Sequence, residues 1–599
     1  MIYHCEDHTC NYWDEGEKLP ERCPQCGRKL LRANEADMTG DDWTALGNTL
    51  WDAEASDKKR MVDCFRKAAY LGSAWGVCNL GICMEQGNGV EADPVQAFWL
   101  YQQAVEMGSL NAVCCLGVCY QYGIGTAPDA KQAAELYCKA AEYGSPRGQM
   151  LLARAFHDGI GVEADAAEAV HWVRAAAYQR YGEGMHRLGV CYAYGDGVEQ
   201  NWEHAVHWFR EAAESGVSVA MADLGYCYEK GCGVEQSWEQ AFSWYRRGAE
   251  CGYPVSMSNL GLCYKRGYGV DQNWQEAIKW YEQGAQCGDL QSMHNLACCY
   301  EGGEGVEQNE DRAFYWYRRS AEGGNGSAMC NLGRCYKRGY GVEQNWQEAV
   351  KWYEQGAQCG NLQSMHNLAC CYEHGEGVEQ NMTEAIRWYT AAAEGGNADA
   401  MHDLGWHYDH GEGVEQDMKK AICWYERAAE QNHPAAMNSL GECYAMGRGV
   451  PRDLETAMEW YRRAAELGEA MADYNMGWHL EQAGKLSEAY AHYRKAADGN
   501  DDSAWWALGR FYENGVVVAQ DGKEARRCYE TGEKLGSVKC KMRLARCKLL
   551  GIGGRREKKA DLDLCRQALE LAKESSEKED YGYEAEMNLL RRTIAENES

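Results

Sequence analysis

Four cysteines near the start of the sequence have a spacing suited to binding a metal ion. Cys5, Cys10, Cys23 and Cys26 lie in the segments HCEDHTC and CPQCG, with the spacing C-x4-C-x12-C-x2-C. Four thiolates suit a tetrahedral structural zinc site, and the tight CPQCG turn brings two of them together. We therefore expect one structural zinc ion, with no coordination position left open for catalysis. His8 is an alternative partner for Cys5, so the second cysteine pair is the better defined of the two.

Histidine and cysteine occur together again in two copies of the stretch HNLACCYE. In a helix His294 and Cys298 are neighbours four residues apart, and so are His366 and Cys370. With Cys330 from the stretch between the copies, His294 and Cys298 are candidate ligands for a soft metal or for a redox site. The favoured interpretation is that these are ordinary surface side chains, and the metal or redox site is the alternative.

These residues belong to a repeat that covers most of the chain. A leucine followed by Gly or Ala, in the pattern LGxCY, recurs every 36 residues, as at Leu260, Leu296 and Leu332. Small, Met and Tyr side chains around this leucine share one face of a helix. A GxGV turn follows, in which glycine permits the positive φ that ends a helix. About fifteen such units follow one another along the chain.

A second helix follows the turn in each unit. Asn273 and Glu276 are typical of its start and resemble a capping box. The helix then carries Ala, Trp, a further aromatic residue and Ala at helical spacing. One helix hairpin cannot bury its apolar face alone, whereas stacked hairpins form a continuous core. The sequence therefore predicts an all-α solenoid of helix–turn–helix repeats.

The full pattern is A-x-x-x-L-G-x-x-Y, then G-x-G-V, then A-x-x-W-Y-x-x-A-A-x-x-G. It resembles the Sel-1-like repeat family, a relative of the tetratricopeptide repeats. The resemblance implies a right-handed superhelix whose first helices line a concave surface that binds protein or peptide. The N-terminal cysteines resemble a zinc ribbon. We expect a zinc ribbon at 1–33, the solenoid at 34–555 and capping helices at 556–599.

Positions near the repeated leucine divide between the core and this surface. The third residue after the leucine is cysteine in ten units and is predicted to be core filler. The residues one and two before it, and two after it, are predicted to face outward. Asparagine in the position directly before the leucine can donate to and accept from an extended peptide backbone. The predicted peptide-binding residues are Asn79, Asn259, Asn295, Asn331, Asn367 and Asn475. The alternative is that asparagine is only a solvated, tolerated residue in an amplified repeat.

Composition restricts the classes of partner. The chain has 61 Lys and Arg against 91 Asp and Glu, a formal net charge of −30. Nucleic acid and anionic membranes are therefore unexpected partners, and a basic or neutral protein is favoured. The sequence shows no secretion signal and no stretch of about 20 apolar residues, so we expect a cytoplasmic protein. Its oligomeric state is not indicated.

The sequence leaves three classes of function open. A protein- or peptide-binding adaptor is the leading hypothesis, and a self-assembling scaffold is a second. A hydrolase is the third, because some Sel-1-like proteins carry a β-lactamase label. Ser-x-x-Lys occurs at Ser56/Lys59 and at Ser575/Lys578, but without the accompanying S-D-N or K-T-G elements. We therefore expect that the protein is not an enzyme.

Overall fold

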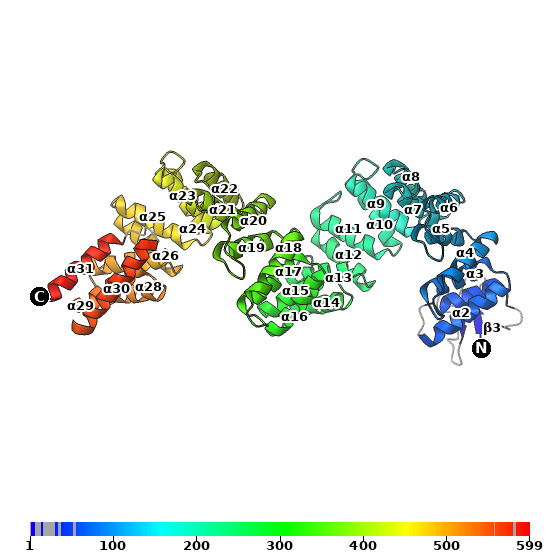
Figure 1. Ribbon diagram of the computed structural model, residues 1–599, viewed down its shortest axis with the longest axis horizontal. Helices are drawn as coiled ribbons and strands as arrows, with labels where there is room; N and C mark the ends of the chain where they lie inside the picture. The colour runs from blue at the N-terminus through cyan, green and yellow to red at the C-terminus, as the bar shows by residue number, and fades with distance from the viewer. Residues whose placement is uncertain are drawn as a thin grey trace. The chain divides into compact units, whose positions relative to one another are not determined.

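A computed structural model describes residues 2–5, 13–15, 30–33, 38–51, 55–555, 558–578 and 583–598. The chain divides into two compact units, Met1–Gln308 and Asn309–Ser599. Within each unit the helices follow one another as antiparallel pairs (Figure 1). The predicted all-α solenoid of stacked helix pairs is therefore confirmed.

A small antiparallel sheet with the strand order β2-β1-β3 precedes the helices. Its strands are β1 Ile2–Cys5, β2 Trp13–Glu15 and β3 Leu30–Ala33. Cys5 ends β1 as part of the described backbone, whereas Cys10, Cys23 and Cys26 lie outside the described residues. The zinc site expected from these cysteines stays a prediction.

The first unit contains helices α1 to α15. Its first helices are α1 Gly40–Thr49, α3 Ala74–Gln86, α5 Leu110–Tyr122, α7 Pro146–Asp158, α9 Gly182–Tyr194, α11 Ser218–Lys230, α13 Pro254–Arg266 and α15 Leu290–Gly302. Its second helices are α2 Ala55–Tyr70, α4 Pro94–Glu106, α6 Ala130–Glu142, α8 Ala166–Tyr178, α10 Trp202–Glu214, α12 Trp238–Glu250 and α14 Trp274–Gln286.

The second unit contains helices α16 to α31. Its first helices are α17 Gly326–Arg338, α19 Leu362–His374, α21 Ala398–His410, α23 Pro434–Met446, α25 Ala470–Gln482, α27 Asp502–Asn514 and α29 Val538–Leu550. Its second helices are α16 Glu310–Glu322, α18 Trp346–Gln358, α20 Met382–Gly395, α22 Met418–Glu430, α24 Leu454–Glu466, α26 Leu486–Asp498, α28 Gly522–Lys534 and α30 Lys558–Lys578. The last helix, α31 Glu584–Glu598, packs against α29 and α30 at the end of the stack.

Helix ends follow the residues expected from the repeat. Gly267 ends α13 in the left-handed region, with φ of 73°, and its N–H donates to the Cys263 carbonyl. An L-residue with a side chain rarely adopts this φ, which explains why glycine begins each GxGV turn. Asn273 then caps α14, because its side chain accepts a hydrogen bond from the Glu276 N–H at 3.2 Å.

In most repeats the core contains an aromatic ring that packs against the repeated leucine and the small residue that follows it. Leu260 and Tyr281 are fully buried, and Tyr281 lies in the second helix of the same repeat. A Cβ atom added at Gly261 would come within 2.5 Å of the Tyr281 ring. In this repeat the ring therefore occupies the space that a side chain at Gly261 would need. We call this ring position, 21 residues after the leucine, the ring slot.

Successive first helices contact one another within each unit. Examples are the pairs α5 and α7, α13 and α15, and α17 and α19. We call the surface that these helices form in each unit the first-helix face. It is the surface that the sequence predicted to bind partners. Among the described residues no helix is both long and apolar enough to cross a membrane.

Candidate functional site

The six predicted asparagines all lie on first helices and are half-buried. The amides of Asn79, Asn367 and Asn475 donate to the preceding first helix, whereas Asn295 Oδ1 accepts from Gln291 Nε2 on its own helix. Asn79 Nδ2 donates to Asn48 Oδ1 at 2.8 Å, and Asn475 Nδ2 donates to Asn438 Oδ1 at 3.0 Å. An asparagine side chain offers two donor hydrogens and two acceptor lone pairs, and these bonds use part of that capacity. At these three positions the row therefore ties neighbouring first helices together, at the surface where it was predicted to bind peptide.

The outward orientation expected two residues before the leucine is wrong at several repeats. Cys330 is only 7% exposed, and Cys78 is likewise buried. Asn367 Nδ2, on the next first helix, donates to Cys330 Sγ at 3.4 Å. The next first helix covers this position, which the periodicity of one helix cannot reveal. His294 and Cys298 lie in the first unit and Cys330 in the second, so the metal site considered as an alternative for these three stays untested.

Two residues after the leucine, side chains do reach the surface. Tyr226 is 46% exposed, and Leu262 and Trp478 are also exposed. Each side chain lies on a first helix, on α11, α13 and α25 respectively. This position therefore places different apolar and aromatic groups along the first-helix face, as side-chain recognition requires.

The cysteines three residues after the leucine are core residues, as predicted. Burial raises the pKa of Cys263 to about 12, so its thiol stays protonated and unreactive at neutral pH. The ten buried cysteines of this set are Cys83, Cys119, Cys191, Cys227, Cys263, Cys299, Cys335, Cys371, Cys443 and Cys547.

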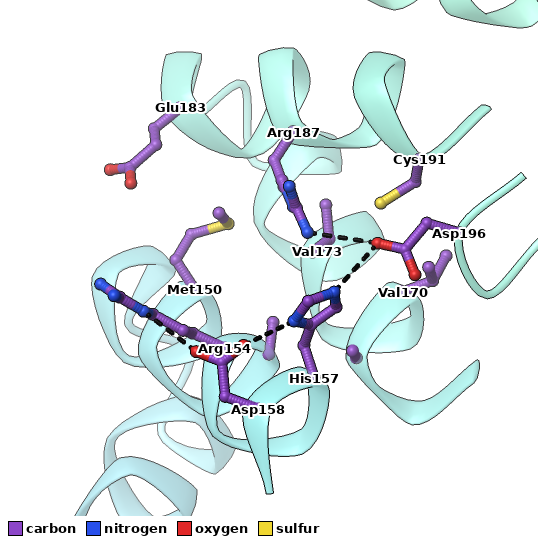
Figure 2. Close-up of a pocket in the computed structure, with 12 residues that line it drawn as sticks. Met150, Arg154, His157, Asp158, Val170, Val173, Glu183, Arg187, Cys191 and Asp196 are labelled. Atoms are coloured by element: carbon purple, nitrogen blue, oxygen red, sulfur yellow. Dashed lines mark hydrogen bonds and ion pairs between the residues drawn. The ribbon is translucent and has the colours of Figure 1, made fainter. Parts of the chain in front are cut away.

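A cavity of about 360 Å³ opens between α7, α8 and α9. Val173 occupies the ring slot here, whereas the repeats on either side place Tyr137 and Phe209 in it. The valine side chain is smaller than an aromatic side chain and leaves part of the ring slot unfilled. The cavity is therefore the space left by a missing aromatic ring, and Val173 lies on its wall (Figure 2).

Charged side chains surround this space in a connected network. His157 lies between two carboxylates, with Nδ1 2.6 Å from Asp158 Oδ1 and Nε2 3.4 Å from Asp196 Oδ2 (Figure 2). Arg187 pairs with Asp196 at 3.2 Å, and Arg154 pairs with Asp158 at 3.4 Å. The hydrogen bond with His157 lowers the pKa of Asp158, which is therefore ionised at neutral pH.

The network favours binding over covalent catalysis. Cys191 is the thiol on the cavity wall, and burial raises its pKa to about 11. A protonated thiol is a poor nucleophile. The carboxylates, guanidinium groups and imidazole instead offer directed hydrogen bonds and charge to a polar group that enters the cavity.

Comparison with known protein families assigns this architecture. The Sel1 repeat model matches thirteen stretches: 76–109, 112–145, 146–181, 182–217, 218–253, 254–289, 290–325, 326–361, 362–397, 398–433, 434–469, 470–501 and 504–537. The chain belongs to the Sel1 repeat family. The helix pairs α1/α2 and α29/α30 flank the matched stretches, so they extend the Sel1 array at both ends.

Two solved structures share this repeat. The crystal structure of c5321, a protective antigen present in uropathogenic Escherichia coli strains that displays an SLR fold, is 32% identical. The match covers 75% of this chain and 97% of that one, with a TM-score of 0.52. A Sel1 repeat protein from Oxalobacter formigenes is 31% identical in sequence. That match covers 41% of this chain and 96% of the other, with a TM-score of 0.38. A comparison with curated proteins finds no match.

The cavity lies where one Sel1 repeat, 146–181, departs from its neighbours. Sequence reasoning missed it, although Val173 in the ring slot was a visible signal. The two Ser-x-x-Lys pairs remain untested, because the side chains of Ser56 and Lys578 lie outside the described residues.

Proposed function

We propose that this Sel1 repeat protein is an adaptor that binds protein or peptide along its first-helix face. The cavity beside Val173 is the observation that carries the proposal. It is a charged recess on first helices α7 and α9, at a position that the adjacent repeats fill with an aromatic ring. A recess of this size accepts one side chain of a partner and fixes its register on the surface.

A basic side chain fits the cavity better than an acidic one. Three carboxylates line it, from Asp158, Glu183 and Asp196, against the two guanidinium groups of Arg154 and Arg187. The net charge of the whole chain, −30, also attracts basic segments. The occupant that we propose is therefore a Lys or Arg side chain of an extended partner segment.

Other parts of the chain complete this proposal. The row of half-buried asparagines and the exposed groups such as Tyr226 and Trp478 supply further contacts along the same face. The four N-terminal cysteines are proposed to hold one structural zinc ion, in a module that caps the array or docks a partner. The free core thiols support a reducing, cytoplasmic compartment.

A random peptide library displayed on phage, selected on the full chain, tests the proposal directly. The same library is selected on Val173→Tyr, which restores the ring of the neighbouring repeats and fills the cavity. In the repeat of Val173 the leucine is followed by alanine and not by glycine. The repeats of Tyr317 and Tyr389 have the same alanine together with a ring, so this alanine is compatible with the added tyrosine. Tyr70→Ser is the control, because Tyr70 is fully exposed at the end of second helix α2.

We expect the selected peptides to be rich in Lys and Arg. Their affinity should fall at least tenfold in Val173→Tyr and should be unchanged in Tyr70→Ser, with the helical circular dichroism of both variants intact. Selection of acidic peptides, or equal binding by wild type and Val173→Tyr, contradicts the proposed occupant of the cavity. A chain that selects no peptide and instead assembles in light scattering is a scaffold and not an adaptor.

A further inference from the structure

Three side chains of different chemistry meet on the first-helix face of the second unit. His366 and Cys370 lie one turn apart on α19, and Asp403 lies on the next first helix, α21. His366 Nε2 is 2.9 Å from Asp403 Oδ2 and 3.9 Å from Cys370 Sγ. One nitrogen, one sulfur and one oxygen atom thus lie within 4.8 Å of one another.

Neighbouring side chains contact two of these groups. The Tyr389 hydroxyl, from the buried ring slot, donates its proton to Glu373 Oε2 at 2.6 Å and lies 3.3 Å from Cys370 Sγ. His402 Nδ1 lies 3.0 Å from Oδ1 of Asp403, the oxygen that does not face His366. Metal ligands are commonly held by such outer hydrogen bonds, which fix their orientation. His366 is 13% exposed and Asp403 34%, so the cluster is sheltered but open to an ion from solvent.

Other repeats contain only part of this set. In the first unit His186 Nε2 pairs with Asp223 Oδ2 at 2.6 Å, but the position equivalent to Cys370 is Val190. The helix α15 carries the same LQSMHNLACCYE sequence as α19, with His294 Nε2 3.8 Å from Cys298 Sγ. The residue 37 positions after His294 is Asn331, where Asp403 stands 37 positions after His366. Within the described part of the chain, the cluster at α19 and α21 is the one group of three or more candidate metal ligands.

We propose that His366, Cys370 and Asp403 bind one divalent transition-metal ion, for which zinc is the best fit. Zinc takes imidazole, thiolate and carboxylate ligands at about 2.0–2.3 Å in a tetrahedral arrangement. Ligand atoms around such an ion are about 3–4 Å apart, close to the separations seen here. Three protein ligands leave the fourth position for water or for a group from a bound partner.

Binding of the ion requires deprotonated ligand atoms. The His366 imidazole nitrogen and the Cys370 sulfur can coordinate a metal ion only when they carry no proton, so metal affinity should fall as the pH is lowered. The competing explanation is a His366–Asp403 ion pair that serves packing alone.

Cobalt(II) titration of the full, reduced, chelator-treated chain tests the site, because a thiolate ligand gives cobalt a characteristic near-ultraviolet band. The variants are Cys370→Ser and Asp403→Asn, and the matched control is Cys298→Ser in the α15 copy. A gain-of-site variant, Val190→Cys, adds the missing sulfur beside His186 and Asp223. Zinc content and the proton release on binding are measured in parallel, and circular dichroism checks folding.

We expect Cys370→Ser to lose one metal equivalent and Asp403→Asn to weaken that site by more than about 100-fold, because outer-shell changes alone cost 10–100-fold. Cys298→Ser should leave the metal content unchanged, and Val190→Cys should add one equivalent. The N-terminal cysteines are unchanged in all variants, so any ion that they hold cancels in the comparison. Equal metal content and spectra in wild type, Cys370→Ser and Asp403→Asn overturn the proposal, as does an equal loss in Cys298→Ser.

Discussion

The ring slot offers a matched pair of substitutions with opposite expected effects. Tyr245 and Tyr281 occupy this slot in consecutive repeats, and both are buried. The Tyr245 hydroxyl donates to Glu229 Oε2 at 2.8 Å. In the next repeat the residue equivalent to Glu229 is Lys265, and the Tyr281 hydroxyl is buried without a hydrogen-bond partner among the described residues. Phenylalanine removes the same atom from both positions.

The sign and size of each effect follow from these contacts. A hydrogen bond to a charged group contributes about 1.5–3 kcal/mol, and Glu229 is 18% exposed, so we expect Tyr245→Phe to cost about 1.5 kcal/mol. A buried hydroxyl without a partner costs about 1–3 kcal/mol, so Tyr281→Phe should stabilise its repeat by about 1 kcal/mol. The two variants should therefore differ by about 2.5 kcal/mol, which is more than tenfold in a local opening equilibrium.

Hydrogen–deuterium exchange of the native chain measures the opening free energy of each repeat separately. Repeat arrays open in segments, and a single global unfolding curve would blur the two repeats together. Peptides from α12 should exchange more than tenfold faster in Tyr245→Phe, and peptides from α14 should exchange more slowly in Tyr281→Phe. Equal destabilisation by both substitutions would refute the polar partnership assigned to the ring slot.

Three further predictions concern other parts of the chain. Burial raises the pKa of Asp501 to about 6, above the unfolded value of about 3.9. Its contribution to stability is therefore present below about pH 3.9 and is lost as the pH rises through about 6. Asp501→Asn should raise the melting temperature at pH 7 more than at pH 4, and an equal effect at both pH values contradicts this. Replacing Asn295, Asn331 and Asn367 together by Ala should weaken the selected peptides at least fivefold, whereas unchanged affinity argues against the asparagine row as a binding surface. Cys26→Ser should remove one zinc equivalent in elemental analysis, and a full zinc content in this variant contradicts the N-terminal site.

The fold could be predicted from the sequence because of the repeat. Residues such as Leu260, Gly267 and Asn273 recur in phase, and each has a local role that one helix or one turn defines. The structure places the leucine in the core, the glycine at a left-handed helix end and the asparagine at an N-cap. Position within a helix therefore predicted secondary structure and core.

The candidate sites depend on register between helices, which the sequence of one repeat does not contain. Cys330 was expected at the surface because it lies opposite Leu332 on its own helix, yet the next first helix covers it. Asp403 stood in the sequence only as a variant of the asparagine row. Its contact with His366, 37 residues earlier, follows from the packing of α19 against α21. Val173 was visible as an exception, but the volume it leaves depends on the neighbouring walls.

Both candidate sites arise where one residue differs within an otherwise regular frame. The stretches 260–309 and 332–381 differ at five of fifty positions, so the chain contains nearly identical first-helix sequences with few distinguishing groups. The leucine, the glycine and the ring carry the stability of each repeat, which leaves the exposed and half-buried positions of the first helices free to change. Asp403 in place of asparagine creates a ligand set, and Val173 in place of an aromatic ring creates a cavity. Specificity in this array is therefore expected to follow the exceptions to the repeat and not the repeat itself.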